Sequence, residues 1–569
     1  MNFRNVLEII VLITIWILFF NAACTQEHKV QPIKVFFDTD IAGDHDDVGA
    51  VAVLHSLSNS GEVEILGMAV SETGNGAKWG APCLDAINTF YGRPNIPIGM
   101  PSHGFRYDEI VYSKQIAEEF TYELDTIWDA TELYRKVLSE QPDTSVVLVT
   151  VGYLTNITNL LHSKPDKYSN LDGIELVNKK VKKWVCMAGN FPEGGEECNA
   201  SSNYPATKFA IANWNRPILF VGYKIGAKIN TGMRLPYIKE TNPVQRAFEI
   251  ATCNGCCNTS FDQATVLAAV RNPQKYWNIV SNGYAVTSNE HYKGVKWEEG
   301  KGKRHSYLTE KTPPAQLEDI IEDLMMDLPN TDKQSFFIMP LNNTIKVVKG
   351  KQFGYRLPYY SYNKGKISIE YNNLPEWVSF SNDSIFGNVP LNVSNNIEFQ
   401  TVLFVNNLPY DTIDIHLSLI DKSLLIENVK LASKGCISVS VGKIKKGDKL
   451  YPDRFFKLNE IPKEYQDYTW ISTPANDGHR YDLGDNFVTF SASTNVTVFV
   501  GYANEFLNEV PAWLKEWEKT QDIISDNTGN SFRIFKKSFP KGKIVLGNNT
   551  TEDKSIRLMY LILVKKEML

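Results

Sequence analysis

An apolar, strand-like segment that runs directly into a dense group of acids constrains this chain more than any other feature. Residues 35–47 read Val-Phe-Phe-Asp-Thr-Asp-Ile-Ala-Gly-Asp-His-Asp-Asp, and an apolar helical pattern follows. A strand that ends in so many carboxylates is electrostatically unfavourable unless a cation lies among them. Hard dications such as Ca²⁺ bind carboxylate and carbonyl oxygens, and open parallel sheets bind ligands at the carboxyl ends of their strands. The segment therefore predicts a metal site at a sheet edge, because a solvated acidic turn would explain neither the strand nor the helix.

The pattern of apolar runs predicts three domains. Strand-like and helical runs alternate up to about residue 330, which is typical of an α/β fold with an open, mainly parallel sheet covered on both faces. The strand-like runs are 64–70, 145–150, 183–187 and 216–221, and the helical ones are 85–91, 127–139 and 262–270. Beyond about residue 335, alternating strands punctuated by Asn, Ser and Thr indicate two β-sandwich domains. The expected domains are 33–329, 335–425 and 426–569.

The length of 569 residues agrees with about three domains, and the net charge of −6 gives no electrostatic footprint for nucleic acid. We therefore expect no nucleic-acid partner.

The first 24 residues resemble a bacterial lipoprotein signal peptide. An apolar run from Val6 to Ala23, interrupted by Glu8, precedes Cys24 and a polar stretch. Cys24 would then carry the lipid and begin the mature chain, anchored to the cell envelope at the periplasm or the cell surface. Asn21 departs from the usual aliphatic residue at its position, so plain secretion and an uncleaved anchor stay open as alternatives.

Five blocks in the first domain resemble, in order, the motifs of the calcium-dependent (inosine-uridine preferring) nucleoside hydrolase family. The match covers roughly residues 33–329. The blocks are Asp38-Thr-Asp40 with Asp46-Asp47, Thr73-Gly-Asn75, Gly152-Tyr-Leu-Thr-Asn156, Met187-Ala-Gly-Asn190 leading to Glu197-Cys-Asn199, and Ser260-Phe-Asp262-Gln.

The resemblance implies a role for each matching residue. Asp40 would be the general base and a Ca²⁺ ligand, with Asp47, Asp262 and the Val151 carbonyl as further ligands. The remaining residues would hold the hydroxyls of a ribose-like ring: Asp46, Asn75, Asn190, Glu197 and Asn199. We expect Glu197 and Asn199 to stand in extended chain, where residues two apart point to the same side.

Two departures from the family pattern limit what the resemblance implies. The acidic loop is longer than in well-known members, so Asp44 and His45 inherit no role; an outer-shell partner or a solvated turn is expected. Phe261 stands on the leaving-group side, where purine-cleaving members carry a His that protonates the base. Because Phe cannot donate a proton, another group activates the base, or the base needs little help, or the substrate is not an ordinary purine nucleoside.

These residues predict an exported N-ribosyl (nucleoside) hydrolase, a glycosidase that acts on ribonucleosides or related small-molecule ribosides. N-glycosidic cleavage passes through an oxocarbenium-like centre. A calcium-bound water on one face of the ring, with a carboxylate to take its proton, suits that reaction. Two alternatives stay open: a sugar-binding surface protein whose hydrolase domain does not turn over, and a hydrolase of another glycoside.

The cysteines admit several states. Cys253, Cys256 and Cys257 lie close together before the Phe261 block, while Cys186 and Cys198 lie near the Glu197 block. In an exported protein a disulfide within or between these loops is favoured over zinc, because no second Cys pair or His pair accompanies them. Free thiols remain the third possibility.

The C-terminal modules resemble immunoglobulin-like modules of bacterial surface proteins and β-rich modules of secreted polysaccharide-degrading enzymes. Their Trp377, Trp513 and Trp517 are expected in the core, with the last two on one buried face of a short helix. A glycan contact through these modules stays open. So does an oligomer, because the resembled family forms homo-oligomers through the α/β domain and the appended modules could block that assembly.

Overall fold

The structure is a computed structural model, and it describes most of the chain after residue 30. The signal segment with Cys24, and the cluster of Cys253, Cys256 and Cys257, lie outside the described residues. Among the described residues, no helix has both the length and the hydropathy that a membrane crossing requires. The described ranges are 31–124, 126–232, 234–235, 238, 241–251, 258–287, 293–302, 304–329, 335–337, 344–357, 359–361, 366–381, 383–393, 397–420, 425–432, 438–440, 444–448, 450–451, 456–473, 486–527, 529–549 and 559–567.

A nine-stranded sheet forms the centre of the first part of the chain, and its strand order is β10-β13-β7-β6-β5-β1-β2-β3-β4. All neighbours pair in parallel except β10 and β13, which are antiparallel. The predicted open, mainly parallel sheet is therefore confirmed. The strands are β1 (Ile33–Thr39), β2 (Val63–Val70), β3 (Ile98–Met100), β4 (Trp128–Asp129), β5 (Val146–Thr150), β6 (Val181–Cys186), β7 (Ile218–Phe220), β10 (Trp277–Val280) and β13 (His305–Glu310).

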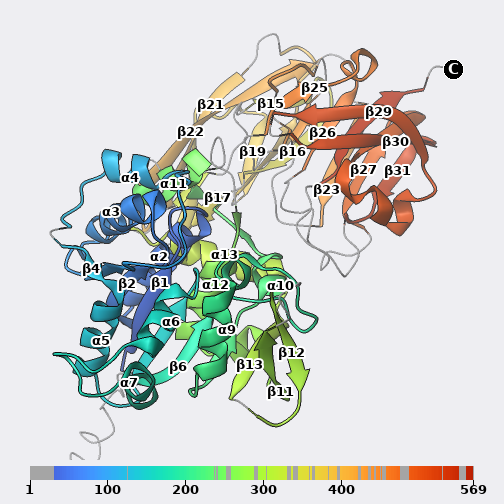
Figure 1. Cartoon of the computed structure of the whole chain (residues 1–569). Coiled ribbons are helices and arrows are strands. Elements are labelled where there is room, and N and C mark those ends of the chain that lie inside the picture. Colours follow the sequence, from blue (N-terminus) through green and yellow to red (C-terminus); the bar gives the residue numbers. More distant parts are fainter. Residues whose placement is uncertain are drawn as a thin grey trace, which may run out of the picture.

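Helices cover both faces of this sheet, as Figure 1 shows in blue to green. Along β1, Val35 and Phe37 belong to one hydrophobic cluster and Phe36 to another, because successive side chains point to opposite faces. The helices are α2 (Asp46–Asn59), α3 (Asn75–Phe90), α4 (Ser113–Glu119), α5 (Ala130–Glu140), α6 (Thr155–His162), α7 (Gly173–Lys180), α8 (Cys198–Ser201), α9 (Tyr204–Asn213), α10 (Tyr223–Gly226), α11 (Pro243–Ala251), α12 (Phe261–Val270) and α13 (Pro314–Met325).

The expected elements are found, with two corrected boundaries. The helix predicted from residue 85 begins at Asn75 and contains Pro82. The helix predicted from residue 127 begins at Ala130, because Trp128 and Asp129 form the edge strand β4 and Asp129 caps the helix by accepting from the backbone N–H of Glu132. The local sequence pattern does not reveal the edge strand β4, because this strand forms only by pairing with β3.

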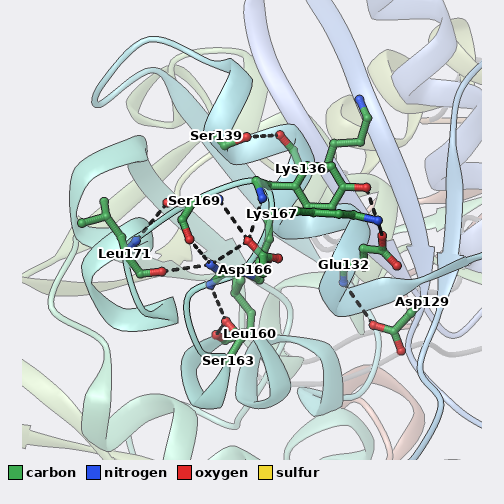
Figure 2. A network of polar contacts seen from close by, with 12 residues as sticks. Asp129, Glu132, Lys136, Ser139, Leu160, Ser163, Asp166, Lys167, Ser169 and Leu171 are labelled. Atoms are coloured by element: carbon green, nitrogen blue, oxygen red, sulfur yellow. Dashed lines mark hydrogen bonds and ion pairs between the residues drawn. The ribbon is translucent and has the colours of Figure 1, made fainter.

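A polar network holds the loop between α6 and α7 against α5 (Figure 2). The buried guanidinium of Arg135 donates to Ser163 Oγ at 2.8 Å and forms an ion pair with Asp166 at 2.8 Å. Lys167 of this loop forms an ion pair with Glu132 on the surface of α5, at a distance of 2.7 Å. Because a buried guanidinium is costly without partners, these contacts fix the helical layer on this face of the sheet.

The C-terminal half is β-rich, shown in yellow to red in Figure 1. A four-stranded and a three-stranded sheet share one hydrophobic cluster between residues 337 and 417, and a three-stranded and a seven-stranded sheet share another between 426 and 564. The four sheets have the orders β15-β22-β21-β18, β16-β20-β19, β23-β27-β31 and β24-β26-β32-β28-β30-β29-β25.

The first β-rich region contains a short two-stranded sheet, β14 with β17, beside its two larger sheets. Its strands are β14 (Ser335–Phe337), β15 (Thr344–Val348), β16 (Gln352–Arg356), β17 (Tyr359–Ser361), β18 (Ile367–Asn372), β19 (Val378–Ser381), β20 (Ser384–Asn388), β21 (Ile397–Val405) and β22 (Leu408–Ile420).

The second β-rich region ends the chain. Its strands are β23 (Ile426–Leu431), β24 (Ser438–Ser440), β25 (Leu458–Glu460), β26 (Thr469–Ser472), β27 (Val488–Ala492), β28 (Val496–Ala503), β29 (Glu518–Asp526), β30 (Ser531–Phe539), β31 (Gly542–Leu546) and β32 (Leu561–Lys566).

The tryptophans of the β-rich half pack into its cores, as expected. Trp377 packs against the first of these clusters, and Trp513 and Trp517 against the second. The short helix expected to carry Trp513 and Trp517 is only one 3₁₀ turn, Ala512–Leu514, so the two rings do not share a helix face. They meet edge to face instead, with centroids 5.6 Å apart.

Candidate active site

Three buried carboxylates meet where β1 gives way to α2 and where α12 begins. Asp46, Asp47 and Asp262 each place a carboxylate oxygen within 4.8 Å of the others. The backbone N–H groups of Phe261 and Asp262 donate to Asp46 Oδ2 at 3.1 and 3.3 Å. Helix N-termini favour negative charge, and here two of them, α2 and α12, converge on one cluster.

One oxygen of this cluster lacks a partner. The Thr39 hydroxyl donates to Asp47 Oδ1, but Asp47 Oδ2 is buried and has no hydrogen-bond partner among the described residues. An unpaired buried carboxylate oxygen is costly. A cation with oxygen ligands would remove that cost, so the residues present fit a hard dication such as Ca²⁺.

Burial and mutual repulsion raise the pKa values of four carboxyl groups in this region, those of Asp40, Asp46, Asp47 and Asp262. Burial is the larger cause for Asp47 and Asp262, and the next causes are the charges of neighbouring acids. Burial, followed by the charge of Asp44, raises the pKa of Asp40 to about 8. In each case the charges that raise the pKa come from other carboxylates, which is the electrostatic pattern that a bound cation would reverse.

Asp40 lies beside this triad at the end of β1. As a residue Asp40 is half-buried, and its charge adds to burial in raising the pKa of Asp46, Asp47 and Asp262. The structure therefore brings the predicted ligands Asp47 and Asp262 together with Asp46, with Asp40 as a close neighbour outside the triad.

Asp38, the first acid of the segment, has a structural position. Its Oδ2 accepts from the Tyr134 hydroxyl at 2.7 Å and from Asn156 Nδ2 at 3.0 Å. Burial raises its pKa to about 7, and these two hydrogen bonds oppose the rise.

The loop after β5 passes close to Asp40. A Cβ atom on Gly152 would lie 2.6 Å from the backbone nitrogen of Asp40, so only glycine allows this approach. The Val151 carbonyl accepts from Asn199 Nδ2 at 2.6 Å, and the same amide contacts the Met187 carbonyl at 3.2 Å. The predicted main-chain ligand Val151 and the predicted hydroxyl-binding Asn199 are therefore direct neighbours.

The prediction that Glu197 and Asn199 both stand in extended chain is wrong, because Asn199 lies within helix α8 and only Glu197 has extended backbone angles. Glu197 is the N-cap of α8, and its carboxylate accepts from the backbone N–H groups of Gly189, Asn199 and Ala200 at 2.8, 2.9 and 3.1 Å. Four free N–H groups at a helix start attract an acid, and this overrides the local extended pattern. Burial raises the pKa of Glu197 and the three hydrogen bonds oppose it.

Asn75 and Asn190 are also predicted to bind hydroxyl groups. Asn75 lies after β2 and Asn190 lies in the loop after β6. Asn75 begins α3 and is exposed, and its backbone N–H donates to Asp108 Oδ1 at 3.0 Å. Asn190 is half-buried, and its Oδ1 is buried without a partner in the described part of the chain. Both side chains retain hydrogen-bonding capacity for a ligand.

The long acidic loop is fixed by neighbours that come from other segments. Tyr112 is fully buried, and its hydroxyl donates to the Asp44 carbonyl at 2.6 Å and also to the Ile41 carbonyl. Asp44 itself is largely exposed and accepts from Asn258 Nδ2 at 2.6 Å, while the His45 ring packs edge-on against Phe248. The extra residues of the acidic loop, Asp44 and His45, therefore form a turn that is held in place by contacts with other segments.

Three residues near Asp40 received no role from the sequence, although Tyr153 lies within the Gly152–Asn156 block. Burial is the largest cause of the raised pKa values of Glu72, Tyr107 and Tyr153, and the charge of Asp40 adds to each of them. Tyr107 lies in the loop after β3, and this loop is held beside Thr73 by two backbone hydrogen bonds. Thr73 N–H donates to the Phe105 carbonyl at 2.7 Å, and Tyr107 N–H donates to the Thr73 carbonyl at 2.9 Å. No motif marks this loop, so only its pairing with the end of β2 could have revealed it.

The described cysteines of the first domain are free thiols. Cys186 is buried in β6, and Cys198 is exposed in α8, next to Glu197. The disulfide prediction is therefore not met at these two positions.

Comparisons with known proteins concern the first part of the chain. No family model and no curated protein matches the sequence. Among solved structures, a plant nucleoside hydrolase is similar at 16% identity, covering 52% of this chain and 99% of that one with a TM-score of 0.40. The inosine-uridine preferring nucleoside hydrolase from Bacillus anthracis gives 14% identity, 52% and 99% coverage and a TM-score of 0.42. A purine-preferring ribonucleoside hydrolase from Gardnerella vaginalis gives 17% identity, 51% and 98% coverage and a TM-score of 0.40.

These structural neighbours are nucleoside hydrolases, matched at low identity over about half of the chain. The likeness concerns the fold, and the assignment to the α/β class rests on the sheet topology itself.

Proposed function

We propose that the first domain hydrolyses the N-glycosidic bond of ribonucleosides or related ribosides. The observation that carries the proposal is the convergence of Asp40, Asp46, Asp47 and Asp262 at the carboxyl edge of the parallel sheet, with an unpartnered Asp47 oxygen among them. Oxygen-only donors favour Ca²⁺. Asp40, Asp47, Asp262 and the Val151 carbonyl would hold it, and Asp46 stands close enough to join them.

Each residue then has a defined task. A bound cation would supply positive charge that lowers the pKa of a water molecule beside Asp40. Asp40 accepts the proton of that water as it attacks the anomeric carbon. Glu197 and Asn199, held by hydrogen bonds to backbone groups, would orient the ring hydroxyls, so that binding energy remote from the broken bond supports the reaction.

The proposal predicts ribose release from at least one riboside. Purified protein, freed of metal by a chelator and resupplied with Ca²⁺, should release ribose from a panel of purine and pyrimidine nucleosides and nicotinamide riboside. A panel of O-glycosides tests the hydrolase of another glycoside. Saturable binding without turnover of any compound would support instead the sugar-binding surface protein, the alternative that Phe261 and the long acidic loop favour.

The location of the enzyme gives a separate prediction. We propose that Cys24 carries a lipid that anchors the exported chain to the membrane, and that the β-rich half is able to contact a glycan. Cys24→Ala should therefore move the protein from the membrane fraction to the soluble exported fraction, as measured by fractionation and immunoblotting. Equal membrane retention of the variant would identify the apolar segment as the anchor.

A further inference from the structure

A two-stranded sheet joins the α/β domain to the first β-rich region. Its strands β14 and β17 are antiparallel, and Phe336 lies opposite Tyr360. Because successive side chains of a strand point to opposite faces, the neighbours Phe336 and Phe337 enter different cores. Phe336 is buried in a hydrophobic cluster of the α/β domain, and Phe337 is buried in the cluster of the first β-rich region. The two parts of the chain therefore share a packed joint.

This joint brings Tyr360 against an arginine that is held by acids of α13. The guanidinium of Arg234 lies over the Tyr360 ring, 4.2 Å from its centroid, and the Tyr360 hydroxyl donates to Asp323 Oδ1 at 2.7 Å. Arg234 Nη1 forms an ion pair with the same Asp323 oxygen at 2.6 Å. Its Nε and Nη2 pair with Glu322 at 3.0 Å and with Asp319 at 2.6 Å. We call these five residues the arginine clamp, in which the rigid guanidinium fork binds several partners at once.

The helix that carries the acids of the clamp also holds strand β8 (Asn230–Thr231). Glu318 and Glu322 stand four residues apart, on one face of α13. Their carboxylates accept from the backbone N–H groups of Asn230 at 2.9 Å and Gly232 at 2.7 Å. Glu322 therefore contacts the clamp through Oε2 and the end of β8 through Oε1. A shift of the clamp would be transmitted directly to β8.

Strand β8 is in turn fastened to the start of α12. It pairs antiparallel with β9 (Asn258–Thr259), which runs directly into Ser260, the N-cap of α12. The Ser260 N–H donates to the Ile229 carbonyl at 2.8 Å, and the hydroxyl oxygens of Thr231 and Ser260 are 2.7 Å apart. Asp262 lies in the first turn of this helix. The position of its carboxylate therefore depends on the strand that the clamp supports.

We propose that Arg234 and Tyr360 are positioning residues of the candidate metal site, through which the first β-rich region helps to hold the Asp262 carboxylate in place for calcium. This inference rests on the proposed function, because it concerns the same metal site. The two residues act through α13 and β8. Outer-shell partners that orient metal ligands commonly contribute about 10- to 100-fold to metal affinity. We expect the lower end of this range, because two further elements lie between the clamp and Asp262.

The calcium affinity of full-length variants tests this inference. Tyr360→Leu removes the ring beside the guanidinium and the hydrogen bond to Asp323, and it should raise the Kd for Ca²⁺ about tenfold. Calorimetric titration of the metal-free protein, well below its unfolding temperature, measures this Kd apart from any change in Tm. Tyr360→Phe keeps the ring and should lie closer to the native protein. Phe380→Leu is the control: it removes a ring of the same β-rich region that is 54% exposed, and its Kd should stay native.

A second variant keeps the charge and removes the fork. Arg234→Lys retains a cation but cannot bind three acids and a ring at once, so its Kd for Ca²⁺ should also rise several-fold. Arg246→Lys is its matched control, because Arg246 forms ion pairs with Glu119 and Glu249 away from the clamp.

The outcomes separate this inference from the proposed function. A native Kd in Tyr360→Leu and Arg234→Lys, or an equal rise in the two control variants, would overturn the inference and leave the proposed function standing. If Arg234→Lys failed to fold, as judged by circular dichroism, the comparison of Tyr360→Leu with Phe380→Leu would decide alone. No calcium binding by the native protein would overturn the proposed metal site, and the proposed function with it.

Discussion

Replacing Asp40 by Asn is expected to lower kcat for riboside hydrolysis by about 10³-fold, the usual worth of a positioned general base. The amide keeps the shape of the carboxyl group but cannot accept the proton of the attacking water. Steady-state kinetics of ribose release at saturating Ca²⁺ measure the effect, and circular dichroism checks that the fold is kept.

Asp44→Asn is the matched control for this substitution. Asp44 lies in the same loop and its side chain is 56% exposed. Its charge helps to raise the pKa of Asp40, so this substitution should move the pH profile of the reaction towards lower pH without removing the base. We expect its kcat to stay within a few-fold of the native value. If Asp40→Asn retained near-native turnover while Asp44→Asn lost it, the base would be misassigned.

Calcium is expected to stabilise the protein more strongly as the pH rises. Without metal, burial and repulsion raise the pKa values of Asp40, Asp47 and Asp262, so the folded state holds protons that the unfolded state has released. Wherever the folded state binds more protons than the unfolded state, the free energy of unfolding falls as the pH rises. Here this interval runs from about pH 4 upward through the folded-state pKa of Asp40. Calcium replaces those protons, so its affinity should increase across the same interval.

Thermal unfolding with and without Ca²⁺ at several pH values measures this linkage. At a hundredfold excess over Kd, binding contributes about 2.7 kcal/mol, which corresponds to a rise in Tm of about 5 to 10 °C for the α/β domain. The rise should be largest near pH 8 and nearly absent near pH 4 to 5. Asp262→Asn should abolish most of it, and a rise that is independent of pH would argue against a carboxylate site.

The sequence predicted the sheet and the acidic centre because both depend on local patterns. The apolar run of β1, its acids and the first turn of α2 are contiguous, and Asp262 opens a helix whose apolar pattern is clear. Parallel strands bring their carboxyl ends to one edge, so the meeting of these acids could be foreseen.

The remaining features of the site depend on contacts between distant segments. Glu197 caps a four-residue helix instead of continuing an extended chain, because free backbone N–H groups of Gly189 and Ala200 reach its carboxylate only in the folded loop. Tyr107 reaches the site through pairing of its loop with Thr73, and Tyr112 braces the acidic turn across the fold. Neither residue type nor spacing marks such contacts.

The most direct test of a calcium-dependent riboside hydrolase is a titration of Ca²⁺ into the metal-free protein with two readouts, bound calcium by equilibrium dialysis and ribose release from the best riboside in the panel. We predict one tightly bound calcium in the α/β domain, with activity rising in proportion to its occupancy and with both lost in Asp262→Asn. Ribose release that is undiminished in the metal-free protein, or a filled calcium site with no release from any riboside, would contradict the account.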